Sequence, residues 1–206
     1  MEHSVEEKRW IICASCVIIS VAVHYYGEDG VRIMPYAMLY ELLPELAMKE
    51  TRSITLFPRN PYGLPPGNYG LVEQYCNEEG CDCRRVLLNV MSDVTMGSVA
   101  VIAYGWESMD FYAKWFGIKK LDIKQMDELE KDSVKSFKGP CLNLFSSQSK
   151  FAPAVMQMVI DCVLKDEKYV DRLKRHYMLF RAIIDEKHRG AKRRNHGKRD
   201  QQNGSI

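Results

Sequence analysis

The sequence predicts an α+β fold in which an antiparallel sheet is covered by helices from both ends of the chain. Two observations support this prediction. Strand-like segments follow one another in the middle of the chain, whereas helical periodicity dominates the segments on either side. The 206 residues are 46% hydrophobic, which is enough for one domain with a substantial core. We expect residues 1–186 to form that domain and residues 187–206 to be a disordered basic tail.

The N-terminal segment 10–23 is strongly apolar and rich in valine and isoleucine. At about 14 residues it is shorter than the roughly 20 that cross a bilayer. The chain also starts with acidic residues, unlike a signal peptide. We therefore expect a buried β-strand, because β-branched residues favour strands. A membrane or signal element, or a start-site artefact affecting residues 1–20, are the alternatives.

The next segment, Pro35 to Glu50, carries leucines at helical spacing and predicts a helix that Pro44 kinks or splits. A short alternating strand, Arg52 to Phe57, follows it. The loop from Pro58 to Gly67 contains four of the eight prolines, so it is expected to form neither strand nor helix.

Three further strand candidates come next, at Tyr69–Tyr75, Arg85–Val90 and Ser98–Tyr104. Sequential strands usually lie side by side, so these three predict an antiparallel meander. The first two are joined by Cys76–Arg84. This connection places a cysteine-rich turn at the tip of a hairpin.

Helical patterns return after the third of these strands. Ser108 is positioned to cap a first helix and Gly117 to end it. The predicted helices cover residues 108–116, 122–131, 150–164 and 166–186, with a short extended run at Cys141–Phe145. The last helix has an apolar stripe, so we expect it to pack on the sheet.

The charge of the chain is unevenly distributed. Residues 187–206 hold seven Lys or Arg and one acid, although the whole chain carries only +2. The rest of the chain is therefore mildly acidic, which excludes a body-wide nucleic-acid footprint. The tail, with Lys192, Arg193 and Arg194 at its centre, is a candidate for contacting nucleic acid, an acidic protein or an acidic membrane surface. A purely solubilising role is the alternative.

The cysteine turn contains Cys76, Cys81 and Cys83 in a C-x4-C-x-C pattern. Zinc binds thiolates tetrahedrally, so its ligands must converge from a tight turn. Gly80 can supply the positive φ that such a turn needs. Cys81 and Cys83 would point to one side, with Asp82 on the other. The pattern therefore predicts a zinc site; three unrelated buried thiols or a redox-active pair are the alternatives.

Arg84 and Arg85 follow the turn directly and are predicted to offset the net negative charge of three thiolates on a dication. Clustered cysteines without a convincing secretion signal indicate a reducing, cytoplasmic environment. Cys13 and Cys16 form a separate C-x-x-C pattern inside the apolar N-terminal segment, where packing is the main interpretation, with redox chemistry or metal binding as alternatives.

The fourth ligand decides between two kinds of site, because a structural zinc is closed by four protein ligands and a catalytic one keeps a position for water. Cys141 is the first candidate, ahead of His176 and Cys162. The remaining candidates are the carboxylates of the turn: Glu78, Glu79 and Asp82.

The stretch from Tyr62 to Gly67, together with Cys76 to Val86, resembles a group of uncharacterised prokaryotic proteins with a cysteine-rich hairpin. The hairpin is also loosely similar to metal-binding modules of the SEC-C kind, although their downstream Cys-Cys or His-Cys pair is absent here. The resemblance covers Tyr62 to Trp106. It implies zinc and implies no reaction.

These features favour a zinc-stabilised binding or adaptor module, whose partner is nucleic acid or protein. A metal-dependent hydrolase with an open zinc position and a nearby acid such as Glu107 is the alternative, and a thiol redox protein is the third possibility. No G-x-S-x-G, P-loop or G-x-G-x-x-G motif occurs.

Overall fold

The computed structural model describes residues 36–118, 126 and 128–203. The side chains of residues 129, 130 and 188–203 are not described. The strand predicted at 10–23 and the Cys13–Cys16 pair lie outside these ranges. Within them, no helix combines the length and the apolar character needed to cross a membrane.

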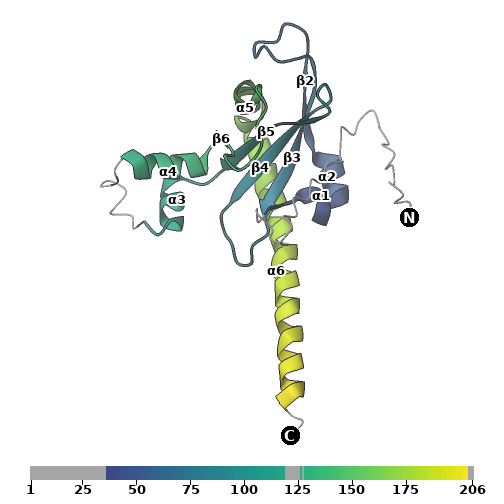
Figure 1. Ribbon diagram of the computed structural model, residues 1–206, viewed down its shortest axis with the longest axis vertical. Helices are drawn as coiled ribbons and strands as arrows, with labels where there is room; N and C mark the ends of the chain where they lie inside the picture. The colour runs from purple at the N-terminus through teal and green to yellow at the C-terminus, as the bar shows by residue number, and fades with distance from the viewer. Residues whose placement is uncertain (1–35, 119–125, 127, 204–206) are drawn as a thin grey trace, which may run out of the picture.

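The fold is α+β, as predicted, and is built on one antiparallel sheet (Figure 1). Among the described residues the strands are β1 (Tyr36–Met38), β2 (Arg52–Leu56), β3 (Gly67–Cys76), β4 (Arg85–Ser92), β5 (Gly97–Gly105) and β6 (Cys141–Leu142). Strands β3, β4 and β5 form the predicted meander. Both β1 and β2 pair with β3, one at each end of it, and β6 closes the other side of the sheet.

The helices of the described chain are α1 (Leu39–Leu42), α2 (Pro44–Glu50), α3 (Met109–Trp115), α4 (Glu128–Lys138), α5 (Ala152–Val159), a π-helical turn η1 (Ile160–Leu164) and α6 (Glu167–Asn203). Ser108 caps α3 as predicted, accepting a hydrogen bond from the Phe111 amide. Asp166 does the same for α6, accepting from the Lys168 amide.

The N-terminal helix differs from the prediction in its first turn. Residues 36–38 are not helical but form β1, whose Tyr36 lies opposite Cys76 of β3. The helix itself is split at Leu43, where Pro44 starts α2, because proline cannot donate the backbone hydrogen bond that would continue α1. The predicted split is therefore confirmed, and the predicted start is wrong.

The charged helix predicted at residues 122–131 is also displaced. Residues 119–125 and 127 lie outside the described part, and α4 runs from Glu128 to Lys138. The side chains of Val134 and Phe137 belong to a small apolar cluster with Tyr112 of α3, so packing against α3 explains the more C-terminal position of this helix.

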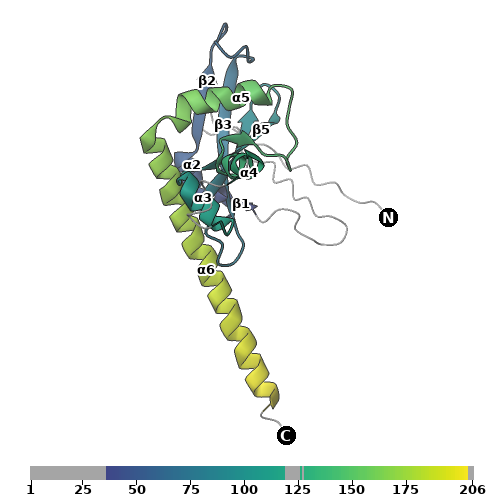
Figure 2. The ribbon, with the colours of Figure 1, turned by 90° about the vertical axis from the view of Figure 1, so that its left-hand side faces the viewer.

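The disordered tail is the largest correction. Helix α6 continues beyond residue 187 and ends at Asn203, and Figures 1 and 2 show it leaving the body of the protein. The absence of apolar periodicity predicted disorder here. Local preference contributes to the helix, because most residues of this segment are strong helix formers such as alanine, lysine, arginine and glutamine, although the two glycines and the histidine, asparagine and aspartate residues are weaker ones.

The main core lies between one face of the sheet and the helices α5 and α6 (Figure 2). The largest fully buried side chains of this core share the inward face of their element: Tyr69, Leu71, Tyr75, Leu88, Ile102, Met158, Tyr169, Leu173 and Phe180. Burying one such aliphatic or phenylalanine side chain stabilises a fold by about 1.5–3 kcal/mol. This packing confirms the apolar stripe predicted for the last helix.

A buried ionic network interrupts this apolar core. His176 is fully buried; its Nδ1 lies 2.7 Å from Glu73 Oε2, and its Nε2 lies 3.2 Å from Glu50 Oε2. Tyr75 donates a hydrogen bond to the same Glu73 oxygen at 2.8 Å, and Arg175 pairs with Glu50. The network therefore links α2 and α6 to the end of β3, the strand that leads into the cysteine turn.

The opposite face of the sheet is smaller and more mixed. Leu87, Val101 and Ala103 are buried there, with Tyr36 and Cys141 packed against them. The aromatic cluster of α3 and α4 adjoins it, because Tyr112 of α3 packs directly on Gly105 at the end of β5.

Candidate metal centre

The cysteine turn connects β3, which ends at Cys76, to β4, which begins at Arg85. Gly80 has the positive φ that the sequence predicted, 68°, and Arg84 also lies in the left-handed region with a φ of 46°. The Cys81 amide donates to the Glu78 carbonyl at 3.4 Å. The backbone therefore takes left-handed conformations at two points of the turn, first at Gly80 and again at Arg84, just before β4.

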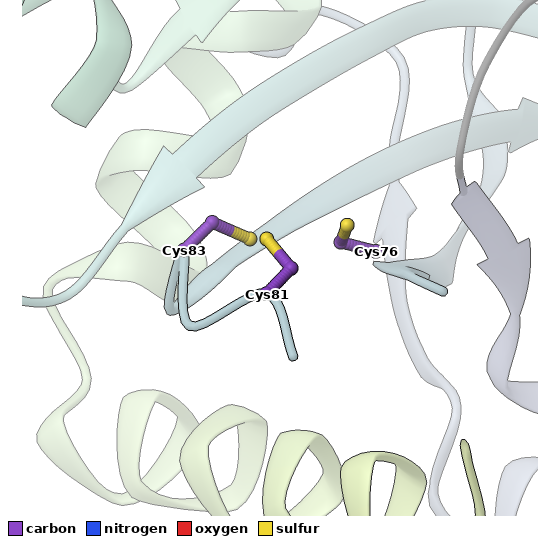
Figure 3. A group of neighbouring side chains, drawn as sticks. All are labelled: Cys76, Cys81 and Cys83. Carbon is purple, nitrogen blue, oxygen red and sulfur yellow. The ribbon is translucent and has the colours of Figure 1, made fainter. Parts of the chain in front are cut away.

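The three sulfur atoms of Cys76, Cys81 and Cys83 lie within 4.8 Å of one another. Figure 3 shows the thiols of Cys81 and Cys83 facing each other across the turn, with Cys76 approaching from the end of β3. Thiolates about 2.3 Å from a tetrahedral zinc are about 3.8 Å apart, so only a small closure separates this arrangement from a metal-bound one. The predicted convergence of these three cysteines is confirmed.

Burial differs among the three thiols. Cys76 and Cys83 are each 3% exposed, whereas Cys81 is half-buried. Hydrogen bonding from the Cys83 thiol lowers the pKa of Cys81 to about 6, against the opposing effect of burial. Hydrogen bonds with Cys76 and Cys81, together with burial, raise the pKa of Cys83. Of these two thiols, Cys81, the more accessible, therefore forms a thiolate more readily than Cys83.

Arg181 of α6 holds the backbone of the turn, and sequence reasoning missed it. The residue is 6% exposed, and its guanidinium donates to the carbonyls of Cys76, at 3.1 Å, and Glu78, at 2.8 Å. It also pairs with Asp185 one helical turn further on. Because one carbonyl belongs to Cys76 and the other to Glu78, two residues further on, Arg181 ties the end of β3 to the beginning of the turn.

Arg84 pairs with carboxylates in this structure, and its predicted role in offsetting the charge of metal-bound thiolates stays a prediction. Its guanidinium forms a two-pronged ion pair with Asp82, at 2.9 and 3.0 Å, and reaches Glu107 at 3.1 Å. Asp82 also accepts a hydrogen bond from the Tyr177 hydroxyl at 3.3 Å. The charge of Arg84 is therefore balanced by carboxylates that brace the outer side of the turn.

Arg85 is placed differently. It is 8% exposed, its guanidinium carbon lies 3.7 Å from the centroid of the Phe137 ring, and its Nε makes no hydrogen bond within the described residues. Burial raises the pKa of Tyr36, Cys83 adds to the effect and Arg85 opposes it; burial also raises the pKa of Tyr112, which Arg85 again opposes. Arg85 and Cys83 thus act on the same two tyrosines.

The candidates for a fourth ligand have other partners and do not join the three sulfur atoms. The Cys141 thiol donates to the Ser136 carbonyl at 2.9 Å, His176 is held between its two glutamates, and the exposed Cys162 lies 3.5 Å from the Tyr62 hydroxyl. In the part of the chain that the structure describes, no other His, Cys, Asp or Glu joins the three sulfurs. The expectation that Cys141 completes the site is therefore wrong for this arrangement.

The basic residues Lys192, Arg193 and Arg194 lie on the part of α6 beyond Ile184, the last buried residue among those of α6 whose side chains are described. They share a helix with Arg181, so the cysteine turn and the basic segment are joined by continuous secondary structure. Comparison with protein-family models, with curated proteins and with solved structures finds no match to this chain.

Proposed function

We propose that the protein is a zinc-stabilised binding module, in which the ion fixes the β3–β4 hairpin. The convergence of three cysteine sulfurs within 4.8 Å supports this proposal most directly. The cysteines of the described chain are free thiols, and a reducing, cytoplasmic setting that keeps them so is part of the proposal. A relationship to the cysteine-rich prokaryotic hairpin proteins that the sequence resembles is also part of it.

The binding partner that we favour is nucleic acid, contacted by the basic extension of α6 through Lys192, Arg193 and Arg194. Lysine and arginine neutralise phosphates without reading the base sequence, and residues 187–203 contain a single acid. The hydrogen bonds of Arg181 to the turn connect this extension to the metal centre. An acidic protein surface is the competing partner.

The metal proposal is tested by elemental analysis of protein purified without added metal. We expect about one equivalent of zinc in the wild type and loss of most of it in Cys83→Ser, because structural zinc needs its thiolates deprotonated and in place. Cys162→Ser is the matched control, since that exposed thiol lies on η1 and outside the cluster. Less than about a tenth of an equivalent of zinc or iron in the wild type, with every thiol reactive, would contradict the proposal.

The partner proposal is tested by titrating labelled random-sequence DNA and RNA with the wild type and with a Lys192→Gln, Arg193→Gln, Arg194→Gln triple variant. The plot of log K against log salt concentration has a negative slope, and losing three phosphate contacts should make it shallower by about 2–3 on duplex DNA. An unchanged slope and affinity would remove nucleic acid from the proposal. If the wild type bound an acidic protein but bound neither DNA nor RNA, the competing partner would be favoured.

A metal-dependent hydrolase is the second candidate, and one observation favours it. Among the described residues only three ligands converge, and a three-ligand zinc with a water in its fourth position is typical of catalytic sites. Glu107, which is bonded to Arg84 beside the turn, is the candidate acid. Zinc-dependent hydrolysis of an activated ester that falls at least tenfold in Glu107→Gln would support this function. A thiol redox role is the third candidate, and it requires reactive thiols without bound metal.

A further inference from the structure

Arg85 differs from the other arginines around the turn because its charge has no counter-ion in the described part of the chain. Arg84 pairs with Asp82 and Glu107, and Arg181 with Asp185. Arg85 is as buried as Arg181, yet its polar contact is the face of the Phe137 ring, and its Nε is buried without a hydrogen bond. A guanidinium carries five N–H donors in a fixed plane, so this group is built to receive acceptors that the described residues do not supply.

The energetics favour an anion at this place. Removing a cation from water costs several times what a single cation–π contact returns, unless a charge or hydrogen-bond partner compensates. Proteins therefore bury arginine mainly where a carboxylate, a phosphate or another anion meets it. Glu107 lies two residues after Gly105, the last residue of β5 and the one opposite Arg85, but it bonds to Arg84 instead.

The surroundings of Arg85 come from four elements and contain hydroxyl and thiol groups. Phe137 lies beneath the guanidinium on α4. The charge of Arg85 acts on Tyr36 of β1, on Tyr112 of α3 and on Cys141 of β6, in each case opposing the rise in pKa that burial causes. Cys83 acts on the same two tyrosines, so the guanidinium and the cysteine cluster border one region of the sheet face.

The groups around Arg85 differ in burial. Tyr36, Cys141 and Cys81 are only partly buried, whereas Cys76, Cys83 and Arg85 are buried. A small ligand would therefore meet the partly buried groups first and would place its most negative group against Arg85.

We propose that Arg85 holds an oxyanion, a phosphate or carboxylate group of a small ligand, beside the free coordination position of the metal. This inference rests on the proposed metal centre, and it assigns that centre an anionic ligand. The guanidinium would bind the oxyanion through paired N–H donors, and Tyr36 could add a hydroxyl donor. The positive charge would also offset the net charge of −1 that three thiolates leave on a dication.

The test uses the full chain loaded with cobalt(II), because the absorption spectrum of cobalt reports its fourth ligand. Inorganic phosphate and acetate are titrated separately to about 50 mM, a range that covers millimolar affinities. We expect at least one of them to shift the cobalt bands, and Arg85→Met to bind that anion at least tenfold more weakly while it keeps the cobalt. The two anions distinguish a phosphate ligand from a carboxylate ligand.

Two variants complete the test. Lys150→Met is the matched control, because it removes another cation lying over a phenyl ring, that of Phe151, near Val99 at the opposite end of β5; its anion affinity should stay within twofold of the wild type. Arg85→Lys keeps the charge but loses the planar donor pair, and it should bind several-fold more weakly. It replaces Arg85→Met if that variant does not fold.

The outcomes separate this inference from the metal proposal. Bound cobalt whose spectrum neither anion shifts would overturn the anion site and leave the metal centre standing. Equal affinity in the wild type and both Arg85 variants would also overturn it. Failure to bind cobalt would contradict the metal centre; calorimetry of phosphate and acetate with the metal-free protein would then decide, since Arg85-dependent binding supports the anion site and its absence rejects it.

Discussion

Replacing His176 with leucine should be among the most destabilising single changes in this protein. The imidazole is fully buried between Glu73, at 2.7 Å, and Glu50, at 3.2 Å. After the substitution, Glu73 keeps only the Tyr75 hydroxyl on Oε2, and its Oε1 already has no hydrogen-bond partner in the described chain. A buried carboxylate would therefore lose its main compensating group.

The expected loss is about 3–5 kcal/mol, the range for removing one partner of a buried ion pair. Leucine fills a volume similar to that of histidine, so a cavity adds little. With a urea m-value of about 2 kcal/mol/M, the unfolding midpoint should fall by roughly 2 M. Equilibrium unfolding in urea, followed by tryptophan fluorescence and circular dichroism, measures this change directly.

A double-mutant cycle tests the reason for the loss. His176→Leu combined with Glu73→Leu removes both buried partners, and the double variant should be more stable than His176→Leu alone, because no uncompensated charge is left. A His176→Leu variant within about 1 kcal/mol of the wild type would refute the reasoning, as would a double variant less stable than the single.

Three further predictions follow from the same contacts. Gly105→Ala places a methyl group 2.1 Å from the Tyr112 hydroxyl oxygen and should cost about 1–3 kcal/mol in thermal unfolding; an unchanged midpoint would contradict this packing. Burial raises the pKa of Glu50. The hydrogen bonds and charges of Arg175 and His176 together lower it by more than burial raises it, so the net shift is downward from 4.5. Its contribution is therefore present above that value and lost as the pH falls below it, and Glu50→Gln should flatten the acid limb of a stability profile. Arg181→Met should weaken zinc binding about 10–100-fold in a chelator competition, and an affinity equal to that of the wild type would show that the hydrogen bonds of Arg181 to the turn do not orient the ligands.

Local sequence patterns predicted the central part of the fold well. The meander follows from alternating strands separated by turn residues, and Gly80 adopts the positive φ for which glycine is suited. The three cysteines converge because two of them are only two residues apart and the third ends the incoming strand. All of these features depend on neighbours in the sequence, which is what periodicity and spacing describe.

Contacts between residues far apart in the sequence could not be predicted from such local patterns. Arg181 reaches the turn across about a hundred residues of chain, and nothing in its own helix indicates that partner. Glu73 did carry a signal, because a carboxylate stood on the inward face of β3 between Leu71 and Tyr75. A single histidine on the buried stripe of the last helix was its natural counterpart, and pairing them would have removed His176 from the candidate metal ligands.

Helix α6 is bonded to the cysteine turn near its middle and extends well beyond it, so a small rotation at that point would give a large displacement at its end. With a rise of about 1.5 Å per residue, the helix extends about 33 Å from Arg181 to Asn203. A tilt of roughly 10° at the anchor would move the far end by about 6 Å, comparable to one helical turn. Because Arg181 donates to the carbonyls of Cys76 and Glu78, any shift of the turn that tilted this helix would be enlarged at its far end.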